Sequence, residues 1–422
     1  MRFIKITLGG RTIGFSYWDE KRQCAQFEYE PEYLADGAEV SPLTMPLSSQ
    51  RYAFDVLDRN TFQGLPGMLS DSLPDRYGNK LIDIWLDRER IPKQNFTPLD
   101  RLCYVGKRGM GALEYEPLLG NVPDGNEIDV NKLALLAEEI SQNRSEMHTK
   151  LTETGIEDLI RVGTSAGGMR AKAVIAFNPS TNEVRSGQID NSPEYSDWLL
   201  KFDTENQDAD KKGYCRIEYA YHLMTKDCGI DMTECRLLEL GERAHFMTRR
   251  FDRVGREKIH VQTLCALAHY DYRQPGAYSY NDVFALMRKL EMPYGDHEQL
   301  FKRMVFNVIM RNCDDHTKNL SFMLSKNGEW RLSPAYDITY AYHPSNVWIG
   351  KHQLSVSGKT EMITMNDLLN LAKRINLKNA ESIIEATLNV ASDWKSYAEI
   401  AGVRAQIVDA IEASLKKNID AM

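Results

Sequence analysis

The chain has 422 residues, a formal net charge of −8 and 42% hydrophobic residues. These values are typical of a globular protein with two or three domains, and they exclude an intrinsically disordered chain. The acidic balance argues against a large nucleic-acid-binding surface, because such a surface must attract phosphates.

No apolar run approaches the roughly 20 residues that a membrane-spanning helix needs. Residues 1–8 alternate between polar and apolar types and precede Gly9 and Gly10, which predicts a strand and a turn rather than a signal peptide. The seven cysteines form no CxxC pair and have no histidine at zinc-binding spacing, as is typical of reduced thiols. We therefore expect a cytoplasmic protein that does not contact a membrane.

Residues 1–125 are predicted to form a small N-terminal subdomain of short strands and turns, with a helix at Tyr77–Arg90. Gly109–Gly111 and residues 121–125 are rich in turn-forming residues and mark its end. An amphipathic helix is predicted next, at Asn131–Arg144.

Residues 126–253 are predicted to form a second, strand-rich domain. A loop of small residues, Gly163–Met169, precedes most of its strands. We expect strands at Lys172–Phe177, Trp198–Phe202, Leu237–Glu239 and Ala244–Thr248, and a helix at Ile217–Asp227.

Residues 254–422 follow a helical period and are predicted to form a third domain. Its helices are expected at Tyr280–Leu290, His297–Arg311, Met365–Ile375, Asn379–Ala391 and Ala405–Leu415. Two strands, Leu320–Leu324 and Trp330–Leu332, are predicted to form a hairpin around Asn327 and Gly328. A strand-rich half followed by a helix-rich half predicts an α+β, two-lobed fold like that of protein kinases.

The most informative pattern surrounds this hairpin. Protein kinases place a catalytic Asp five residues before a metal-binding Asn, with a further metal-binding Asp downstream. Asp314 and Asn319 have this spacing, and Asp337 follows the hairpin. Because a hairpin returns its second end beside its first, we expect Asn319 and Asp337 to lie together, as two ligands of one Mg²⁺ must.

Each of these residues has a plausible chemical role in phosphoryl transfer, which depends on positioning and charge neutralisation. Asp314 would orient the acceptor hydroxyl and accept its proton, while Asn319 and Asp337 would hold Mg²⁺. His316 and Lys318 would reach phosphate oxygens or fix the loop. The alternative interpretation of this polar run is an ordinary solvated turn.

The second domain supplies the remaining parts of a kinase. The N–H groups of Gly163–Met169 could contact ATP phosphates, although an ordinary turn would have the same composition. Lys201 would neutralise the α- and β-phosphates and pair with Glu218. The alternatives are a strand lysine that extends to solvent and a solvated helix glutamate.

Two other classes of protein remain open. Asp314, Asp315 and His316 could ligate two metals of a phosphohydrolase, but this leaves the glycine loop, Lys201 and Glu218 unexplained. A nucleotide-binding scaffold without turnover is the third possibility, and it ranks last because the chain keeps every catalytic group.

The pattern Asn312-x-Asp-Asp-His-x-Lys-Asn319, followed by Pro334-x-Tyr-Asp337, resembles the signature of the HipA family. This family comprises bacterial serine/threonine kinases that act as toxins of type II toxin–antitoxin modules. Residues 41–47 and 73–75 are similar to the family's N-terminal subdomain. The resemblance runs through most of the chain and implies a HipA-like fold with ATP and Mg²⁺ as cofactors.

The resemblance also implies a role for individual residues. Asp314 matches the catalytic base, Asn319 and Asp337 the metal ligands, and Lys201 the ATP-contacting lysine. The other implied nucleotide contacts are Gly167, Gly168, Met169, Arg170, Ala171, Lys172, Arg249, Arg250, Phe251, His316, Lys318 and Tyr336. The family commonly has Glu at the position of Arg249, and Met169-Arg170-Ala171 replaces a run that typically contains Gln and Glu.

Ser165 falls at the family's autophosphorylated serine. Phosphate there would place about −1.5 to −2 charge in a loop that should cradle phosphate, so the resemblance implies self-inactivation. It further implies a helix-turn-helix antitoxin of the HipB type, contact with DNA only through that partner, and a translation component such as an aminoacyl-tRNA synthetase as substrate. From the residues themselves, Tyr270–Tyr280 is a candidate substrate-facing loop, because tyrosines suit contact surfaces, and the alternative is that these tyrosines belong to the core.

Overall fold

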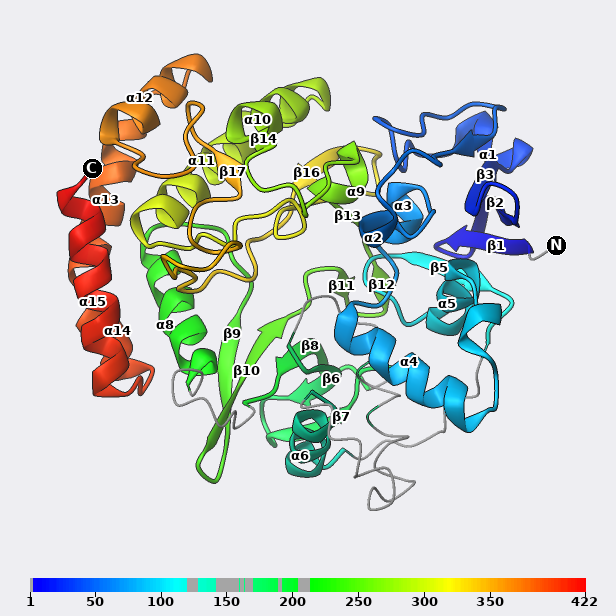
Figure 1. Ribbon diagram of the computed structural model, residues 1–422, viewed down its shortest axis with the longest axis horizontal. Helices are drawn as coiled ribbons and strands as arrows, with labels where there is room; N and C mark the ends of the chain where they lie inside the picture. The colour runs from blue at the N-terminus through cyan, green and yellow to red at the C-terminus, as the bar shows by residue number, and fades with distance from the viewer. Residues whose placement is uncertain are drawn as a thin grey trace. The chain divides into compact units, whose positions relative to one another are not determined.

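The computed structural model describes residues 3–119, 128–141, 159, 163, 170–188, 192–203 and 213–422. The chain divides into two compact units, whose elements are drawn in Figure 1. The first comprises Met1–Lys212, Leu238–Gln262 and Ala266–His269, and the second comprises Gly213–Leu237, Thr263–Cys265 and Tyr270–Met422.

An antiparallel sheet with the order β4-β3-β2-β1-β5 begins the first unit. Its strands are β1 (Phe3–Leu8), β2 (Arg11–Asp19), β3 (Cys24–Tyr29), β4 (Tyr52–Ala53) and β5 (Leu113–Glu116). Gly9 and Gly10 both have positive φ and form the predicted turn between β1 and β2. The helices of this region are α1 (Pro31–Asp36), α2 (Arg59–Phe62), α3 (Gly67–Ser70), α4 (Arg76–Arg88), the 3₁₀ turn Lys93–Asn95 and α5 (Pro98–Val105).

A second sheet, of order β7-β6-β8-β10-β9, follows the helix α6 (Val130–Ser141). Its strands are β6 (Lys172–Asn178), β7 (Glu183–Ser186), β8 (Ser196–Lys201), β9 (Cys235–Leu240) and β10 (Arg243–Arg249). The strands expected at 172–177, 198–202, 237–239 and 244–248 and the helix expected near 131 are thus confirmed. All seven residues of β6 are buried, as expected for a strand covered on both faces.

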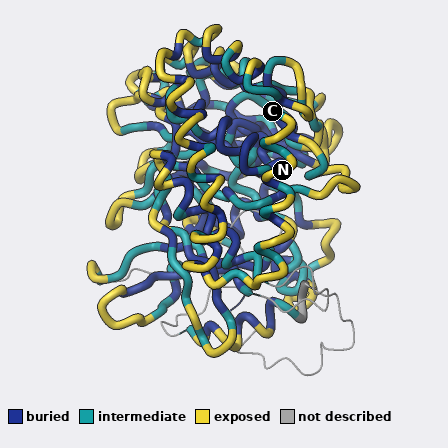
Figure 2. Tube along the Cα trace, turned by 90° about the vertical axis from the view of Figure 1, so that its left-hand side faces the viewer, coloured by how far each residue is buried: buried dark blue, intermediate teal, exposed yellow. Residues whose placement is uncertain are grey.

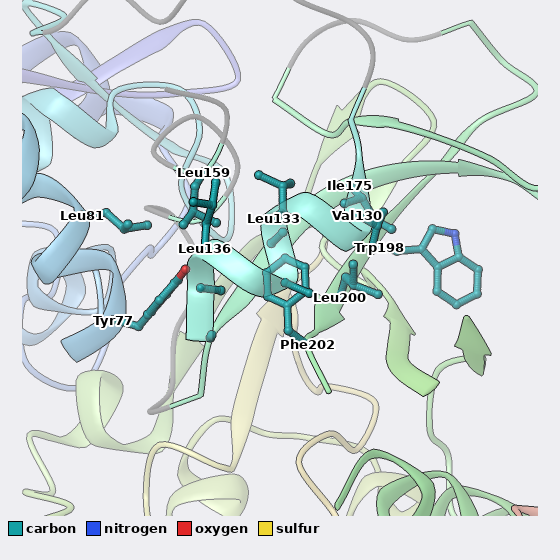
Figure 3. Close-up of a cluster of buried hydrophobic side chains, with 14 of the residues drawn as sticks. Tyr77, Leu81, Val130, Leu133, Leu136, Leu159, Ile175, Trp198, Leu200 and Phe202 are labelled. Atoms are coloured by element: carbon teal, nitrogen blue, oxygen red, sulfur yellow. The ribbon is translucent and has the colours of Figure 1, made fainter. Parts of the chain in front are cut away.

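One hydrophobic core joins α4, α6 and the second sheet (Figure 3). Tyr77 and Leu81 of α4, Leu133 of α6, and Ile175 and Leu200 of the sheet all have exposed fractions of 3% or less. Each such side chain stabilises the unit by roughly 1.5–3 kcal/mol when it leaves water. Residues before and after position 120 therefore share a single core within the first unit.

The second unit is mainly helical. Its helices are α8 (Tyr214–Asp227), α10 (Tyr280–Lys289), α11 (Tyr294–Ile309), α12 (Met365–Arg374), α13 (Ala380–Ser392), α14 (Trp394–Ile400) and α15 (Ala405–Asp420). The six helices expected near 217, 280, 297, 365, 379 and 405 are confirmed, and the α+β class with them. Buried and exposed stretches alternate along many of the helices in Figure 2, the pattern of amphipathic helices that cover a core.

Short elements complete the fold. They are β11 (Arg253–Val254), β12 (Glu257–Lys258), β13 (His260–Thr263), α9 (Leu264–Ala268), β14 (Tyr278–Ser279), β15 (Ser321–Leu324), β16 (Trp330–Leu332) and β17 (Leu354–Ser355). The predicted hairpin is present, since β15 and β16 pair antiparallel from Leu324 opposite Trp330. Gly328 has a φ of +81° in its turn. Among the described residues, no helix has both the length and the apolar character needed to cross a membrane.

Candidate functional site

Residues 312–319, here called the acidic loop, connect α11 to β15. The backbone reverses at Arg311, which has a φ of +53°, and the N–H of Cys313 donates to the carbonyl of Ala341 at 2.9 Å. Farther along, the N–H of Asn319 donates to the carbonyl of His316 at 2.9 Å. The loop is therefore fixed at both ends before the hairpin begins.

Asn319 and Asp337 line one pocket in the second unit, as the hairpin predicts. The Asn319 side-chain amide donates to the carbonyl of Asp314 at 2.8 Å, which ties the amide to the first residue of the acidic pair. Asp337 has a φ of +52°, a conformation that Asp and Asn tolerate better than most residues. The other residues of the pocket wall include Arg303, Asp315, His316, Tyr336 and Ile338.

Asp314 faces outward while its neighbour Asp315 is buried. The Asp314 side chain is 45% exposed, and its Oδ1 lies 3.8 Å from Nε2 of His316. The ring of Tyr272 lies beside the same loop, with its centroid 5.4 Å from that of His316 and 5.0 Å from Nζ of Lys318. Asp314 is thus accessible to a hydroxyl group from solvent, and Tyr272 belongs to the tyrosine-rich segment that the sequence marks as a candidate for substrate contact.

The carboxylate of Asp315 accepts three hydrogen bonds from the protein. The donors are the Tyr280 hydroxyl at 2.9 Å, Nδ1 of His352 at 3.1 Å and the Gln353 N–H at 2.7 Å. Burial alone would lower the pKa of His352, but the negative charge of Asp315 prevails and raises it to about 10. Both oxygens of Asp315 are therefore occupied by protein donors, which argues against a two-metal site built on Asp314, Asp315 and His316.

Tyr336 fixes the two ends of the hairpin to each other. Its hydroxyl donates to the carbonyl of Lys318 at 2.8 Å and also contacts the hydroxyl of Ser321. The buried guanidinium of Arg303 donates to the carbonyl of Ser333, just before this tyrosine, and burial lowers the pKa of Arg303 to about 10. The sequence predicts Tyr336 as a nucleotide contact, and in the structure its hydroxyl orders the backbone of the pocket.

In the first unit, Lys201 is 6% exposed on β8. In the strand register its backbone lies opposite Lys172 of β6 and Phe246 of β10. It is therefore not a lysine that extends to solvent. Nζ of Lys172 lies 3.7 Å from the carboxylate of Asp75, whose pKa burial raises to about 6 despite this nearby charge. Glu218 lies on α8 of the second unit and is 1% exposed, which excludes the solvated alternative for it as well.

Arg249–Arg253, here called the hinge run, is organised around the buried Asp252. This carboxylate accepts hydrogen bonds from Arg250 at 2.7 Å, Arg253 at 2.8 Å and the Gly111 N–H at 2.7 Å. Burial alone would raise the pKa of Asp252, but the two guanidinium groups lower it to about 2. The Arg250 side chain is thus used within the protein, whereas Arg249 is exposed and Phe251 is half-buried.

Part of the predicted phosphate loop lies outside the described residues, namely Ser165, Gly167, Gly168 and Met169. At its described end, Arg170 is half-buried, and the carbonyl of Ala171 accepts a hydrogen bond from the N–H of Phe202 at 3.1 Å.

The residues that sequence reasoning missed are those that support the acidic loop, namely Asn307, Tyr280, His352 and Gln353. Tyr280, His352 and Gln353 lie 35, 37 and 38 residues from Asp315, so no spacing could have marked them, and Asn307 lies five residues before the motif begins at Asn312.

Comparison with known proteins defines the family of this chain. The HipA N-terminal domain model matches residues 4–116, and the HipA-like C-terminal domain model matches residues 164–394, more than half of the chain. The chain belongs to the HipA family.

Relatives and solved structures agree with this assignment. Curated relatives include a "Putative kinase" of Haemophilus influenzae, 28% identical over 134 residues, and "Putative kinase Y4mE" of Sinorhizobium fredii, 25% identical over 192 residues. These matches cover 28% and 43% of this chain but only 39% of each relative. The HipA chain in a Shewanella oneidensis MR-1 complex with HipB and operator DNA matches with a TM-score of 0.66 and 16% identity, covering 99% of this chain and 95% of that one. This last match shows the HipA fold.

Proposed function

We propose that the chain is an ATP- and Mg²⁺-dependent serine/threonine protein kinase of the HipA type. The observation that carries this proposal is the shared pocket of Asn319 and Asp337, beside the loop that exposes Asp314. Membership of the HipA family and the names of the two curated relatives support the same reaction class.

The residues of the second unit would divide the work as follows. Asp314 would orient the acceptor hydroxyl and accept its proton. Asp337 would hold Mg²⁺ through its carboxylate. Asn319 would do so through its amide oxygen, because the amide nitrogen donates to the carbonyl of Asp314. When bound, Mg²⁺ and ATP would supply charge neutralisation and the transferable phosphoryl group.

The first unit would contribute the phosphate contacts. Lys201, a buried lysine on a central strand, would bind the α- and β-phosphates, with Glu218 as its ion-pair partner. The residues from Gly167 to Lys172 would contribute backbone N–H groups, and the backbone of the hinge run would meet adenine.

The wider role follows from the family. We propose a protein acceptor in translation, such as an aminoacyl-tRNA synthetase, and a HipB-type helix-turn-helix antitoxin through which the chain would reach DNA. The HipB and operator DNA bound to the Shewanella oneidensis HipA support this partner. We also propose Ser165 as a self-inactivating phosphorylation site, and mapping the label to another residue would contradict it.

Transfer of labelled γ-phosphate tests the reaction. We expect the parent to label itself or an acceptor protein in a lysate, and Asp314→Asn and Asp337→Asn each to lower the rate by on the order of 100-fold or more. Asn suits the second position, because it tolerates the positive φ there. Asp409→Asn, at an exposed carboxylate 3.7 Å from Lys395, is the matched control and should keep parental activity.

Two outcomes would favour the other classes. Release of phosphate without any labelled protein would indicate a hydrolase, although the occupied oxygens of Asp315 argue against that. Binding of ATP without transfer would indicate a scaffold. Activity that survives both carboxylate substitutions would contradict the assignment of the site.

A further inference from the structure

The side chain of His352 lies against the acidic loop. Its Nδ1 lies 3.1 Å from the carboxylate of Asp315, and its Nε2 lies 3.8 Å from Sγ of Cys313. Cys313 and Asp315 are the residues immediately before and after Asp314. One imidazole ring therefore contacts both chain neighbours of the exposed carboxylate.

The same segment is connected to the rest of the second unit. The N–H of His352 donates to the carbonyl of Thr360 at 2.9 Å, and the carbonyl of Gln353 accepts from the N–H of Gly276 at 2.9 Å. Immediately afterwards, β17 pairs in parallel with β14, with Leu354 opposite Tyr278. His352 thus belongs to a fixed part of the fold and can hold a loop in place.

A buried chain of hydrogen bonds supports Asp315 from the other side. Asn312 donates to Asn307 at 2.9 Å, Asn307 donates to the Tyr280 hydroxyl at 3.1 Å, and that hydroxyl donates to Asp315 at 2.9 Å. This chain begins and ends in the acidic loop, at residues 312 and 315, and passes through α11 and the first residue of α10. The loop is therefore held between two helices and the His352 segment.

We propose that His352 is a positioning residue for phosphoryl transfer, which clamps Cys313 and Asp315 so that Asp314 is presented to the acceptor and Asn319 to the pocket. This inference rests on the proposed kinase function and assigns a role that neither the motif nor its spacing contains. His352 touches neither acceptor nor nucleotide in this scheme, because its side chain is 8% exposed and both of its ring nitrogens face the loop.

Charge and burial favour a clamp over a simple filler of space. Asp315 is 5% exposed, and its buried carboxylate is stabilised by three donors, of which the imidazole is the one that carries a charge. With its pKa raised to about 10, His352 carries a positive charge at neutral pH and attracts Asp315. Any displacement of Asp315 must also move Asp314, and misplacing a catalytic group by about 1 Å costs on the order of 100-fold in rate.

The test compares two substitutions at this position. His352→Leu removes the donor to Asp315, whereas His352→Asn keeps an N–H close to the place of Nδ1. We expect His352→Leu to lower kcat for phosphoryl transfer by tenfold to 100-fold, on the order of the loss from a misplaced group, with KM for ATP within about twofold. His352→Asn should recover a clear part of that loss. His343→Ala, at an exposed histidine in the same segment, should match the parent.

A second measurement separates this inference from the proposed function. Hydrogen exchange should become faster at the N–H groups of Cys313 and Asn319 in His352→Leu and remain parental in His343→Ala, whether or not any acceptor is labelled. Parental kcat and parental exchange in His352→Leu would overturn the clamp. So would a loss of kcat that equals the loss of folded protein, or one that Asn does not recover. If the parent transfers no phosphate, the kinase proposal fails and the exchange result still decides whether His352 holds the loop.

Discussion

Single buried charges hold segments of this chain together, and Asp252 is the clearest case in the first unit. Its carboxylate is 1% exposed and meets two guanidinium groups, with side-chain exposures of 2% for Arg250 and 10% for Arg253. The same guanidinium groups donate to the carbonyl of Gly109 at 3.3 and 3.0 Å. The hinge run is thereby tied to the end of the N-terminal region.

Asp252→Asn should destabilise the protein by about 3–5 kcal/mol, because it leaves two buried guanidinium groups facing a neutral amide. Chemical unfolding of the parent and the variant at neutral pH measures this. Asp55→Asn is the matched control, since Asp55 pairs with Arg22 at 2.7 Å at an exposed site and should cost no more than about 1 kcal/mol. Equal losses in the two variants would contradict the argument.

The contacts of Asp252 with Arg250 and Arg253 also predict how the free energy of unfolding depends on pH at the acid end. The pKa of Asp252 in the folded protein is about 2, below the ordinary value for Asp. Its stabilising contribution is therefore complete above about pH 4 and is lost as the pH falls toward 2. The difference in unfolding free energy between the parent and Asp252→Asn should shrink over this interval.

At the scale of elements, the sequence predicts what has a strong local signal. Two apolar runs around Asn327 and Gly328 predict the hairpin, and it forms with positive φ at Gly328. Long amphipathic helices were found within a few residues of their bounds. The sequence does not predict short elements such as α2, α3, α14 and β17, because two to seven residues carry too little periodicity and their stability comes from tertiary packing, as at the buried Trp394 of α14.

The start of α12 shows how local chemistry fixes an element. The hydroxyl of Thr364 accepts from the N–H of Asp367 at 3.3 Å, and the Asp367 carboxylate accepts from the N–H of Thr364 at 2.8 Å. This reciprocal capping satisfies two N–H groups that the helix leaves without partners. The carboxylate also accepts from Lys359 at 2.8 Å, so the helix start is joined to the segment before it.

Thr364→Ala should lower the free energy of unfolding by about 1 kcal/mol, because it removes the cap without creating a cavity. Thermal or denaturant unfolding detects this change. Ser345→Ala, at an exposed position outside any helix, should leave stability within about 0.5 kcal/mol of the parent. Parental stability in Thr364→Ala would show that packing alone fixes the start of α12.

At the scale of the whole molecule, motif spacing predicted which residues belong to the pocket but not what holds them there. Asn319 and Asp337 could be placed together from a hairpin, since a hairpin is local. His352 and Tyr280 could not, because they reach Asp315 from 37 and 35 residues away through tertiary contacts. Residue spacing thus predicts which groups share the pocket, and packing determines the groups that hold them there.

The shared core of the first unit gives a prediction for the chain as a whole. Leu81 and Tyr104 of the N-terminal region lie in one cluster with Leu133, Ile175 and Leu200 of the region that follows. Residues 4–116 match one family model and residues 164–394 match another, yet within this unit the apolar side chains of both regions form a single core. We therefore expect that neither region alone buries its side of the core.

Residues 128–422 expressed without the preceding segment should therefore be largely insoluble or bind hydrophobic dyes, because removal of α4 and α5 exposes the side chains they cover. Co-expression with residues 1–119 as a separate chain should restore soluble protein, since the same apolar surfaces can meet between two chains.

Leu81→Ala in the full chain should lower the free energy of unfolding by about 2–5 kcal/mol. Leu118→Ala, at a side chain that is 57% exposed, should lower it far less. A soluble, cooperatively unfolding fragment 128–422 would contradict this account and show that the second region folds without the contacts of the first.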